Sequence, residues 1–582
     1  MNTPLIYTLP FRAQIALACL LLWCAFPPLS IWPLAFMSIA LFLPTILRKE
    51  KLSAKEYRWL WCCSSLLWLA LLQGIRLAYW PLYGGWLALS LYCGVYLPLW
   101  VGTCRKLVHT WKIPWQIAAP CTWVAWELFR GYFITGFSAC LLGHTVVDQP
   151  ILIQIAAHLG GYGVSAMIVI AGGLLYQVIH AVYAFRGKAA RLNGYEFVFP
   201  IACVAAWIFY GIVSVQTPHE KDSSAKPLLT AALIQENSPT LFEANPERNA
   251  RSWQSYLELT TKTLLANPKV DLVIWPESVF TADNPLLDLE PGFEVPSVWA
   301  REGASNGMTK EQLAELSQEL REQFNMKADI AQRGAAPKRP ATSESGSEPD
   351  QKPLKLPHLI VGNDLLRVRG DQMARLNAAV WIDRDGKRAG YYAKRHLVMF
   401  GEYIPLGDLF PIFYSIIGMA PASSGELCQT FDLGDGVQLA PTICFENVLP
   451  HLNRRSIVES IAQGNNPSIM INLTNDGWFR GSSILDHHLA CATFACVENR
   501  RPLLIAANTG LSAWIDGSGR QIAVSKRLTA ESIIATPYRD SRSGLWQQCG
   551  DWTWWVVAII CWSLWLWRKQ LEPLDCGDSS PL

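Results

Sequence analysis

The chain has 582 residues, a formal net charge of +2 and 26 Trp, and 51% of its residues are hydrophobic while only 16% are charged. An ordinary soluble domain carries about 25% charged residues. This composition therefore excludes a disordered chain, a fibrous repeat and an ordinary cytosolic enzyme. The near-zero net charge gives no reason to expect nucleic acid or another polyanion as a partner.

The charged residues are distributed unevenly along the chain. Residues 1–216 hold 14 Lys and Arg and 5 Asp and Glu, which is about 9% of that segment, whereas the rest of the chain is about 21% charged. Two different solvents would explain this contrast. We expect the first third to face lipid and most of the remainder to face water.

Eight apolar stretches have about the length that a membrane-spanning helix needs. They are residues 13–29, 31–47, 59–75, 84–103, 115–133, 162–184, 197–215 and 552–568. Only Pro27-Pro28 separates the first two spans, which predicts a tight hairpin. The N-terminal stretch runs into the first span without a clear cleavage pattern, so we interpret it as a retained anchor. The predicted domains are a membrane part (1–216), a soluble part (217–550) and a last span with its tail (551–582).

Basic residues cluster in alternate loops between these spans. The clusters lie in 48–58, in 104–112, in 186–191 and at Arg568-Lys569. The positive-inside rule places all four in the cytoplasm. Seven crossings would then deliver residues 217–551 to the opposite side of the membrane. The alternative is that one of the weaker spans is a buried core helix, which would reverse the orientation of the soluble part. The span 115–133 is the weakest candidate, because Glu127 and Arg130 lie near its end.

The 16 Cys do not form a disulfide pattern. About half of them fall inside the predicted spans, where a thiol serves as a small apolar side chain. The others are scattered without regular spacing, so a disulfide framework is not supported.

From about residue 228, short apolar runs alternate with polar helical stretches, which predicts a layered α/β domain. The expected strands are Leu228–Ile234, Val270–Trp275, His358–Val361, Ala378–Ile382, Val437–Ile443 and Ser468–Leu473. Asp385-Gly386 after the fourth strand is a hairpin turn signal. Residues 283–356 interrupt the pattern and are interpreted as an insertion. Within it, Lys310–Asn325 has the spacing of a surface helix, and 333–353 is rich in Pro, Ser, Gly and charge, which predicts a flexible segment.

Three segments place a reactive side chain at or near the end of an apolar run. They lead to Glu277, to Lys394 and to Cys444. A Cys nucleophile needs a base for its proton, and a carboxylate can serve as that base. An ammonium can stabilise the oxyanion that forms when sulfur attacks a carbonyl. Taken singly, each residue has an ordinary structural explanation: a buried small side chain for the Cys, a solvated turn for the Glu, and a basic surface for the Lys.

In this order and context, the segments resemble the nitrilase superfamily, which uses a Glu-Lys-Cys triad on an α-β-β-α sandwich. More narrowly, they resemble the apolipoprotein N-acyltransferases, in which that domain is inserted between membrane helices. The residues that carry the resemblance are Trp275-Pro276-Glu277-Ser278, Lys394-Arg395-His396-Leu397-Val398, Phe400-Gly401-Glu402-Tyr403-Ile404-Pro405-Leu406, Cys444-Phe445-Glu446, Asn472-Leu473-Thr474-Asn475-Asp476-Gly477-Trp478-Phe479, Asn499-Arg500-Arg501-Pro502-Leu503-Leu504, and Trp126-Glu127-Leu128-Phe129-Arg130-Gly131 with Thr135-Gly136-Phe137. The resemblance covers nearly the whole chain except 283–356.

The resemblance implies a membrane enzyme with a multi-pass helical domain and an α-β-β-α sandwich. Cys444 would attack a phospholipid acyl ester and hold the acyl group as a thioester, with Glu277 as the general base and Lys394 as the oxyanion stabiliser. The α-amine of a diacylglyceryl-cysteine lipoprotein would then accept the acyl group. Glu402 and Glu446 match supporting positions, although Glu446 could instead pair with a buried Lys or Arg. The implied location is the bacterial inner membrane, with the sandwich on the periplasmic side.

Asn475, Trp478 and Phe479 are the candidate substrate contacts. The two aromatic side chains could line an acyl entrance, but aromatic residues also favour membrane interfaces for no catalytic reason, and both readings stay open. Two positions depart from the family pattern: Phe445 stands where Tyr is common, and Ala244 stands where Trp is usual. The first departure leaves any role of the Tyr hydroxyl unfilled in this chain.

Neither a metal nor a cofactor is expected. Asp486, His487 and His488 suggest a metal site at first sight, but adjacent His side chains point in different directions on a helix. No Gly-rich phosphate loop occurs in the sequence.

Two other functions compete with acyl transfer. A membrane-tethered nitrilase or amidase would use the same triad with water as the acceptor. A transport protein would use the spans themselves, but they carry few internal charges besides Glu127 and Arg130, and transport pathways usually need more.

Overall fold

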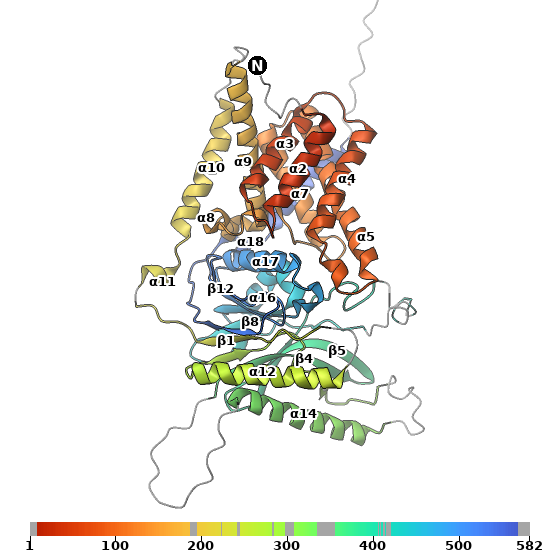
Figure 1. Ribbon diagram of the computed structural model, residues 1–582, viewed down its shortest axis with the longest axis vertical. Coiled ribbons are helices and arrows are strands. Elements are labelled where there is room, and N and C mark those ends of the chain that lie inside the picture. Colours follow the sequence, from red (N-terminus) through yellow and green to blue (C-terminus); the bar gives the residue numbers. More distant parts are fainter. Residues whose placement is uncertain are drawn as a thin grey trace, which may run out of the picture.

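The computed structural model describes residues 9–186, 195–222, 224–240, 245–281, 285–296, 308–334, 356–405, 407, 409–410, 412, 414 and 421–567. A bundle of helices forms one end of the molecule, and a sandwich of two sheets with flanking helices forms the other end (Figure 1). The two predicted parts of the chain therefore correspond to two different architectures.

Each of the eight predicted spans contains a helix. The helices are α2 (Phe11–Ala25), α3 (Pro33–Leu47), α4 (Ala54–Leu71), α5 (Leu82–Gly94) followed by α6 (Tyr96–His109), α7 (Trp115–Tyr132), α9 (Ala156–Arg186), α10 (Tyr195–Ser214) and α19 (Trp552–Leu566). In the described chain, three segments are long and apolar enough to cross a membrane by themselves, namely Leu82–His109, Ala156–Val182 and Glu196–Ser214. The helices α2, α3 and α19 are apolar but shorter. These helices make the chain a membrane protein.

The first two helices form the predicted hairpin. The Ser38 hydroxyl donates to the main-chain oxygen of Ala18 at 2.8 Å. The turn between α2 and α3 contains Pro27-Pro28, as expected from the sequence. The basic pair Arg568-Lys569 and most of the 186–191 loop lie outside the described residues.

The charges near the end of α7 hold a non-helical segment against the bundle. Residues 133–141 leave α7 without regular structure and continue into η2 (Leu142–Val146). Glu127 Oε1 accepts a hydrogen bond from the Leu142 amide at 2.7 Å, and Arg130 donates to the main-chain oxygens of Ala139 and Cys140 at 3.2 and 3.3 Å. Irregular backbone inside a membrane protein must have its polar groups satisfied by the protein itself. Glu127 and Arg130 therefore have a structural role in the span that the sequence marked as weakest.

Two sheets lie face to face in the soluble part. Their strands are β1 (Ala231–Gln235), β2 (Leu272–Ile274), β3 (Leu286–Leu289), β4 (His358–Arg369), β5 (Gln372–Ile382), β6 (Arg388–Ala393), β7 (Phe431–Asp432), β8 (Gln438–Ile443), β9 (Ile469–Thr474), β10 (Leu503–Ala507), β11 (Ala513–Ile515), β12 (Gln521–Val524) and β13 (Glu531–Ala535). The first sheet has the order β13-β1-β2-β4-β5-β6, with β3 added beside β4, and the second has the order β12-β11-β10-β9-β8-β7. All six predicted strands are confirmed, as is the Asp-Gly hairpin between β5 and β6.

Helices cover the outer face of each sheet (Figure 1). The first sheet is covered by α12 (Pro246–Ala266) and α14 (Lys310–Arg333), and the second by α16 (Pro450–Ala462) and α17 (Ile484–Asn499). Between the sheets lies a fully buried apolar layer that includes Leu233, Ile274, Ile360, Leu473 and Leu504. The predicted α-β-β-α sandwich is therefore confirmed.

The structure corrects the interpretation of residues 283–356 as an insertion. Strand β3 pairs in parallel with β4, so part of this segment belongs to the sheet. Helix α14 extends well beyond the predicted surface helix and buries an inner stripe that includes Leu313, Phe324 and Ala328. The Ser317 hydroxyl donates to the main-chain oxygen of Leu287 at 2.7 Å. Most of the Pro- and Ser-rich stretch 333–353 lies outside the described residues.

The sandwich rests on the bundle through α17 and α18 (Leu545–Cys549), which both pack on α9 (Figure 1). Phe494 of α17 and Trp546 of α18 belong to the same buried cluster as the bundle helices. Gly160 in α9 has φ +66°, and a Cβ there would come within 2.5 Å of the Trp546 ring. The kink in α9 and the missing side chain therefore make room for this anchor.

Candidate active site

Glu277 follows β2 and lies where the chain turns away from the first sheet. Its carboxylate is 7% exposed and accepts hydrogen bonds from Asn377 Nδ2 at 2.7 Å and from the Asn475 amide at 2.9 Å. The neighbouring strand has Gly362 at this point, and a Cβ on Gly362 would come within 2.5 Å of the Glu277 Cα. The glycine thus allows the close approach that sets the direction of the carboxylate.

Lys394 lies directly after β6 and is 1% exposed. Its ammonium lies 2.9 Å from Glu402 Oε1 and 3.4 Å from Glu277 Oε1. Burial alone would lower the pKa of Lys394, but the charges of Glu277, Cys444 and Glu402 raise this pKa well above its ordinary value. Lys394 is therefore an ammonium at neutral pH.

Cys444 stands at the end of β8 and begins η3 (Cys444–Val448). Its φ of +50° is a left-handed conformation that a residue with a side chain rarely adopts. Burial raises the pKa of the Cys444 thiol well above its ordinary value, and Glu277 raises it further while Lys394 lowers it. The resting group is a neutral thiol, so a reaction at sulfur needs a base.

The three candidate residues come together across the sandwich. Glu277 and Lys394 follow strands of the first sheet, and Cys444 follows a strand of the second. The thiol lies within electrostatic reach of both charged groups. This arrangement combines a carboxylate that can accept a proton, a sulfur nucleophile and a fixed positive charge.

Glu402 and Glu446 support the two halves of this site in different ways. Glu402 pairs with Lys394, and its second oxygen accepts from the Val398 amide at 2.8 Å. Glu446 accepts from the main-chain amides of Arg395 at 2.7 Å and Ile443 at 2.8 Å, and from the Tyr392 hydroxyl. Glu446 therefore ties the segment after Lys394 to the strand before Cys444. The alternative of pairing with a buried Lys or Arg side chain is not what the structure shows.

The candidate substrate contacts occupy different environments. The Asn475 amide donates to Glu277, while its side-chain oxygen accepts from Thr240 and from Asn508 at 2.9 and 3.1 Å. Phe479 packs against the buried cluster beneath α17. Trp478 is half-buried in η4 (Asp476–Phe479), which contacts η1 (Ile75–Leu77) of the bundle. A role of Trp478 and Phe479 in lining an acyl entrance stays a prediction.

The structure places three further polar residues at the site, to which the sequence alone assigns no role there. Asn377 donates to Glu277, and Asn472 donates to the Cys444 main-chain oxygen at 3.3 Å. His488 lies 3.2 Å from the same oxygen. Asn377 could have been noticed as an amide in a largely apolar strand, whereas Asn472 and His488 stand in motifs that do not reveal their contacts with Cys444. Within the described residues, His, Cys, Asp and Glu form no group of three or more that could hold a metal ion.

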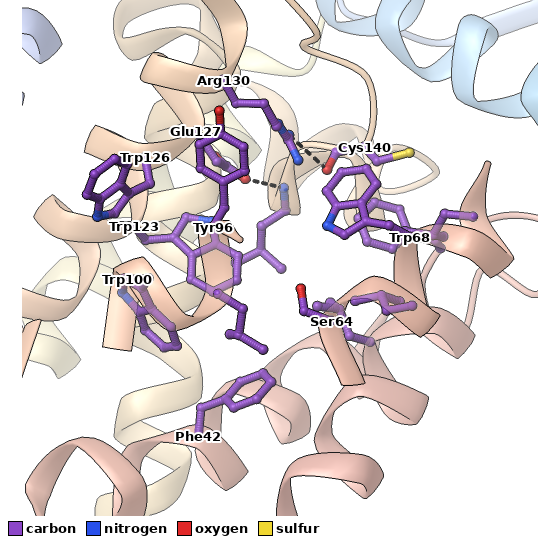
Figure 2. Close-up of a pocket in the computed structure, with 16 residues that line it drawn as sticks. Phe42, Ser64, Trp68, Tyr96, Trp100, Trp123, Trp126, Glu127, Arg130 and Cys140 are labelled. Atoms are coloured by element: carbon purple, nitrogen blue, oxygen red, sulfur yellow. Dashed lines mark hydrogen bonds between the residues drawn. The ribbon is translucent and has the colours of Figure 1, made fainter. Parts of the chain in front are cut away.

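A cavity of about 70 Å³ lies inside the helical bundle. Figure 2 shows Arg130, Glu127 and Cys140 toward one end of the cavity and Phe42 at the opposite end. The lining between them is apolar and aromatic and includes Trp68, Leu97, Trp100, Trp123 and Trp126. Such a cavity suits hydrocarbon more than water.

A Cys, a Lys and a Glu at strand ends of an α-β-β-α sandwich define a nitrilase-type protein. Two family models agree: residues 357–542 match the carbon-nitrogen hydrolase model, and residues 18–174 match the apolipoprotein N-acyltransferase N-terminal domain. An apolipoprotein N-acyltransferase of Rhodopirellula baltica is 31% identical over 94% of this chain and 95% of its own length. The chain belongs to the apolipoprotein N-acyltransferase family and is an acyltransferase.

Other relatives are more distant. An apolipoprotein N-acyltransferase of Geobacter metallireducens is 28% identical over 73% of this chain and 69% of its own length. Another, of Haemophilus influenzae, is 24% identical over 86% of this chain and 83% of its own length. Among solved structures, Nit3 of Saccharomyces cerevisiae, a member of the nitrilase superfamily, is 15% identical with a TM-score of 0.34 and covers 55% of this chain and 92% of its own.

Proposed function

We propose that this protein transfers an acyl chain from a phospholipid to the α-amine of an S-diacylglyceryl-cysteine at the start of an apolipoprotein, through a thioester on Cys444. The observation that carries the proposal is that Glu277 and Lys394 lie 3.4 Å apart after strands of one sheet, and that Glu446 ties the segment after Lys394 to the strand before Cys444. The site lies on a domain that packs against membrane helices. Family membership supports acyl transfer, and the site supports the covalent route.

In the first half-reaction, Glu277 takes the proton of Cys444 as sulfur attacks the acyl ester carbon. A C–S bond forms, and the carbonyl electron pair moves onto oxygen. The Lys394 ammonium stabilises this oxyanion. When the intermediate collapses, the ester C–O bond breaks and the leaving alkoxide takes the proton from Glu277. The products are a lysophospholipid and an acyl thioester on Cys444.

In the second half-reaction, the amine of the diacylglyceryl-cysteine attacks the thioester carbon. Glu277 takes a proton from the attacking nitrogen, and Lys394 again stabilises the oxyanion. The C–N bond forms and the C–S bond breaks. The departing sulfur recovers the proton from Glu277, so the enzyme returns to its starting state and the lipoprotein carries an amide.

Both proposed substrates are anchored in a membrane, and the molecule is built to meet them there. Helix α17 has one face on the bundle, while η3, which begins with Cys444, contacts the same helix. We place the protein in the bacterial inner membrane with the sandwich on the periplasmic side, because the basic loops at 48–58 and 104–112 lie at the other ends of the helices. The aromatic and aliphatic lining of the cavity shown in Figure 2 is compatible with apolar groups.

The competing function is a membrane-tethered hydrolase that uses water as the acceptor. The match of residues 357–542 to the carbon-nitrogen hydrolase model is the reason to consider it. Its first half-reaction would be the same. The two functions differ in what discharges the thioester. Water would release a free fatty acid, whereas the lipopeptide amine would form an amide.

The test uses purified full-length protein, phosphatidylethanolamine with a labelled acyl chain, and a synthetic diacylated lipopeptide. We expect mass spectrometry to find the acyl group on the Cys444 peptide, and to find it transferred when the lipopeptide is added. Cys444→Ala should abolish both signals. Cys428→Ala is the matched control, because Cys428 is buried in the same domain with its thiol against Ser456. Discharge to water alone would support the hydrolase, and undiminished transfer by Cys444→Ala would overturn the mechanism.

A further inference from the structure

His488 lies near the start of α17, directly behind the nucleophile. Its Nε2 lies 3.2 Å from the main-chain oxygen of Cys444, and its Nδ1 lies 3.3 Å from Asp476 Oδ2. The side chains of His488 and Asp476 are only 10% and 6% exposed. The sequence motif Asp486-His487-His488, which suggested a metal at first sight, thus places one imidazole between two oxygen atoms of the active-site region.

The two partners of His488 fix its protonation state. A main-chain carbonyl and a carboxylate are both acceptors, and neither can donate. A neutral imidazole carries one N–H, so it could satisfy only one of these contacts and would turn a lone pair toward the other oxygen. Both contacts are hydrogen bonds only when both ring nitrogens carry a proton. The geometry therefore selects the imidazolium.

The surroundings of His488 agree with a positive charge. Burial alone would lower the pKa of His488, but the charge and hydrogen bond of Asp476 raise this pKa above its ordinary value, helped by the Cys444 carbonyl and by Glu277. Several other titratable side chains in or near α17 make contacts away from His488. Asp486 bonds Arg527, His144 lies against Phe494 farther along α17, and Glu498 accepts from the Gly161 amide. His451 stacks on Tyr132, His158 bonds Tyr210, and Arg454 donates to the Trp546 main-chain oxygen.

We propose that His488 is a positioning residue of the acyl-transfer site, which as an imidazolium holds the main chain of Cys444 and places a positive charge beside the nucleophile. It acts through Cys444 and does not touch substrate. The proposal rests on the function proposed above and deepens it. In this proposal Lys394 supplies the positive charge that stabilises the oxyanion, and His488 supplies a second positive charge at the main-chain oxygen of Cys444.

Two physical effects follow from this placement. First, His488 and Asn472 both donate to the Cys444 carbonyl, which stabilises the left-handed conformation of the nucleophile. Second, a buried positive charge in the neighbourhood of a thiol favours its thiolate. Such a charge at His488 would oppose burial, Glu277 and Asp476, which all raise the pKa of the Cys444 thiol. Asp476 keeps the imidazole charged, as a carboxylate partner does for a His that must stay protonated.

His488→Gln separates the two effects. The Gln amide can still donate to the Cys444 carbonyl, but it carries no charge. We expect the pH at which iodoacetamide modifies the Cys444 peptide to rise by about one unit, which corresponds to about tenfold less thiolate at a given pH. The kcat of acyl transfer should fall by about tenfold, while KM for phospholipid stays within about twofold.

His487→Gln is the matched control, because it makes the same chemical change one residue earlier, where the ring lies against Phe26 and not against Cys444. Its alkylation profile and kcat should be those of the wild type. If His487→Gln and His488→Gln change all three measurements equally, the effect is a disturbance of α17 and the proposal is wrong. A wild-type kcat and an unshifted alkylation profile in His488→Gln would overturn it as well.

Asp476→Asn tests the same inference without altering the imidazole. Without the carboxylate, burial lowers the pKa of His488, so the charge is lost as the pH rises through this lower pKa. We expect a new loss of kcat on the alkaline side that the wild type lacks, and no further loss when His488→Gln is added. An unchanged pH profile, or fully additive effects, would contradict the proposal. The modification of Cys444 by iodoacetamide is measured without any acyl-transfer substrate. It therefore tests the role of His488 even if the protein does not catalyse the proposed acyl transfer.

Discussion

At the scale of single residues, the Lys394 ammonium is the group on which the site depends most. It is almost fully buried between Glu277 and Glu402. A buried charge needs charged or hydrogen-bonded partners, and two carboxylates supply them here. Because Lys394 divides its interaction between both, the ammonium holds Glu277 less tightly than it would in an exclusive ion pair.

Glu402→Gln should therefore impair the first half-reaction. The Gln side chain keeps the shape and can still accept from the Val398 amide, but Lys394 would then pair with Glu277 alone. The closer pair would hold the Glu277 carboxylate on Lys394 and away from the proton of Cys444. We expect single-turnover acylation of Cys444 to slow by about tenfold to a hundredfold, measured with labelled phospholipid.

The control for this prediction is Glu290→Gln, which removes a carboxylate that pairs with Arg369 at 3.2 Å outside the site. Its acylation rate should stay at the wild-type value. Wild-type acylation in Glu402→Gln would show that Glu277 does not need the second carboxylate.

At the scale of elements, α17 connects the site to the membrane bundle. His488 near its beginning contacts the Cys444 main chain, and Phe494 lies in the cluster shared with the bundle. Near its end, Glu498 accepts from the Gly161 amide of α9 at 2.8 Å. One helix thus contacts both the candidate site and the bundle.

Glu498 makes the stability of this contact depend on pH. Burial raises the pKa of Glu498 to about 8, although the bond from Gly161 works against the shift. The folded state therefore keeps the Glu498 proton at pH values at which the unfolded state has already released it. The contribution of Glu498 to the free energy of unfolding is highest below about pH 4.5. It falls by about 1.4 kcal/mol per pH unit above that value and levels off near pH 8.

Glu498→Gln should remove this pH dependence, because the neutral amide resembles the protonated acid and can still accept from Gly161. We expect the variant to be more stable than the wild type at pH 7, by on the order of 2–4 kcal/mol, and no more stable at pH 4.5. Thermal unfolding in detergent between pH 4.5 and 8 measures the difference. The exposed Glu319→Gln serves as the control, and a slope equal to that of the wild type in Glu498→Gln would contradict the assignment.

Elements with a strong hydrophobic signal could be predicted from the sequence, and elements that depend on tertiary contacts could not. Strands such as β8 and β9 are buried on both faces, so they read as continuous apolar runs. Helix α14 buries only a narrow stripe with Leu313 and Phe324, and its many charges made it resemble a surface insertion.

The same distinction applies to the site. Glu277, Lys394 and Cys444 stand at strand ends, where a sequence pattern draws attention to them. His488 is an ordinary helical residue in the sequence, and only the fold brings it to the Cys444 carbonyl. Its partner Asp476 lies in a separate short turn, so no local spacing indicates the pair.

At the scale of the whole molecule, the sandwich is fixed to the bundle by contacts from the chain that leaves it. Trp546 of α18 is fully buried against α9 at Gly160, and Arg454 of α16 donates to the Trp546 main-chain oxygen at 2.9 Å. The next helix, α19, returns into the bundle and packs on α7. The catalytic domain is therefore held at both of its chain ends, through α10 and α19.

The orientation of this assembly can be tested with reporter fusions. If the basic loops face the cytoplasm, a periplasm-active phosphatase should be active after residue 217 and inactive in the 186–194 loop, while a cytoplasm-active galactosidase should show the reverse. The two sites differ only by α10, so each is the control for the other. Each of the eight predicted spans contains a helix, with α5 and α6 together in one span, and three of these segments in the described chain are long and apolar enough to cross a membrane by themselves. Phosphatase activity in the 186–194 loop with none after residue 217 would mean that α10 crosses the membrane but that one of the first six crossings does not exist. It would place the sandwich in the cytoplasm, away from the proposed lipoprotein acceptor.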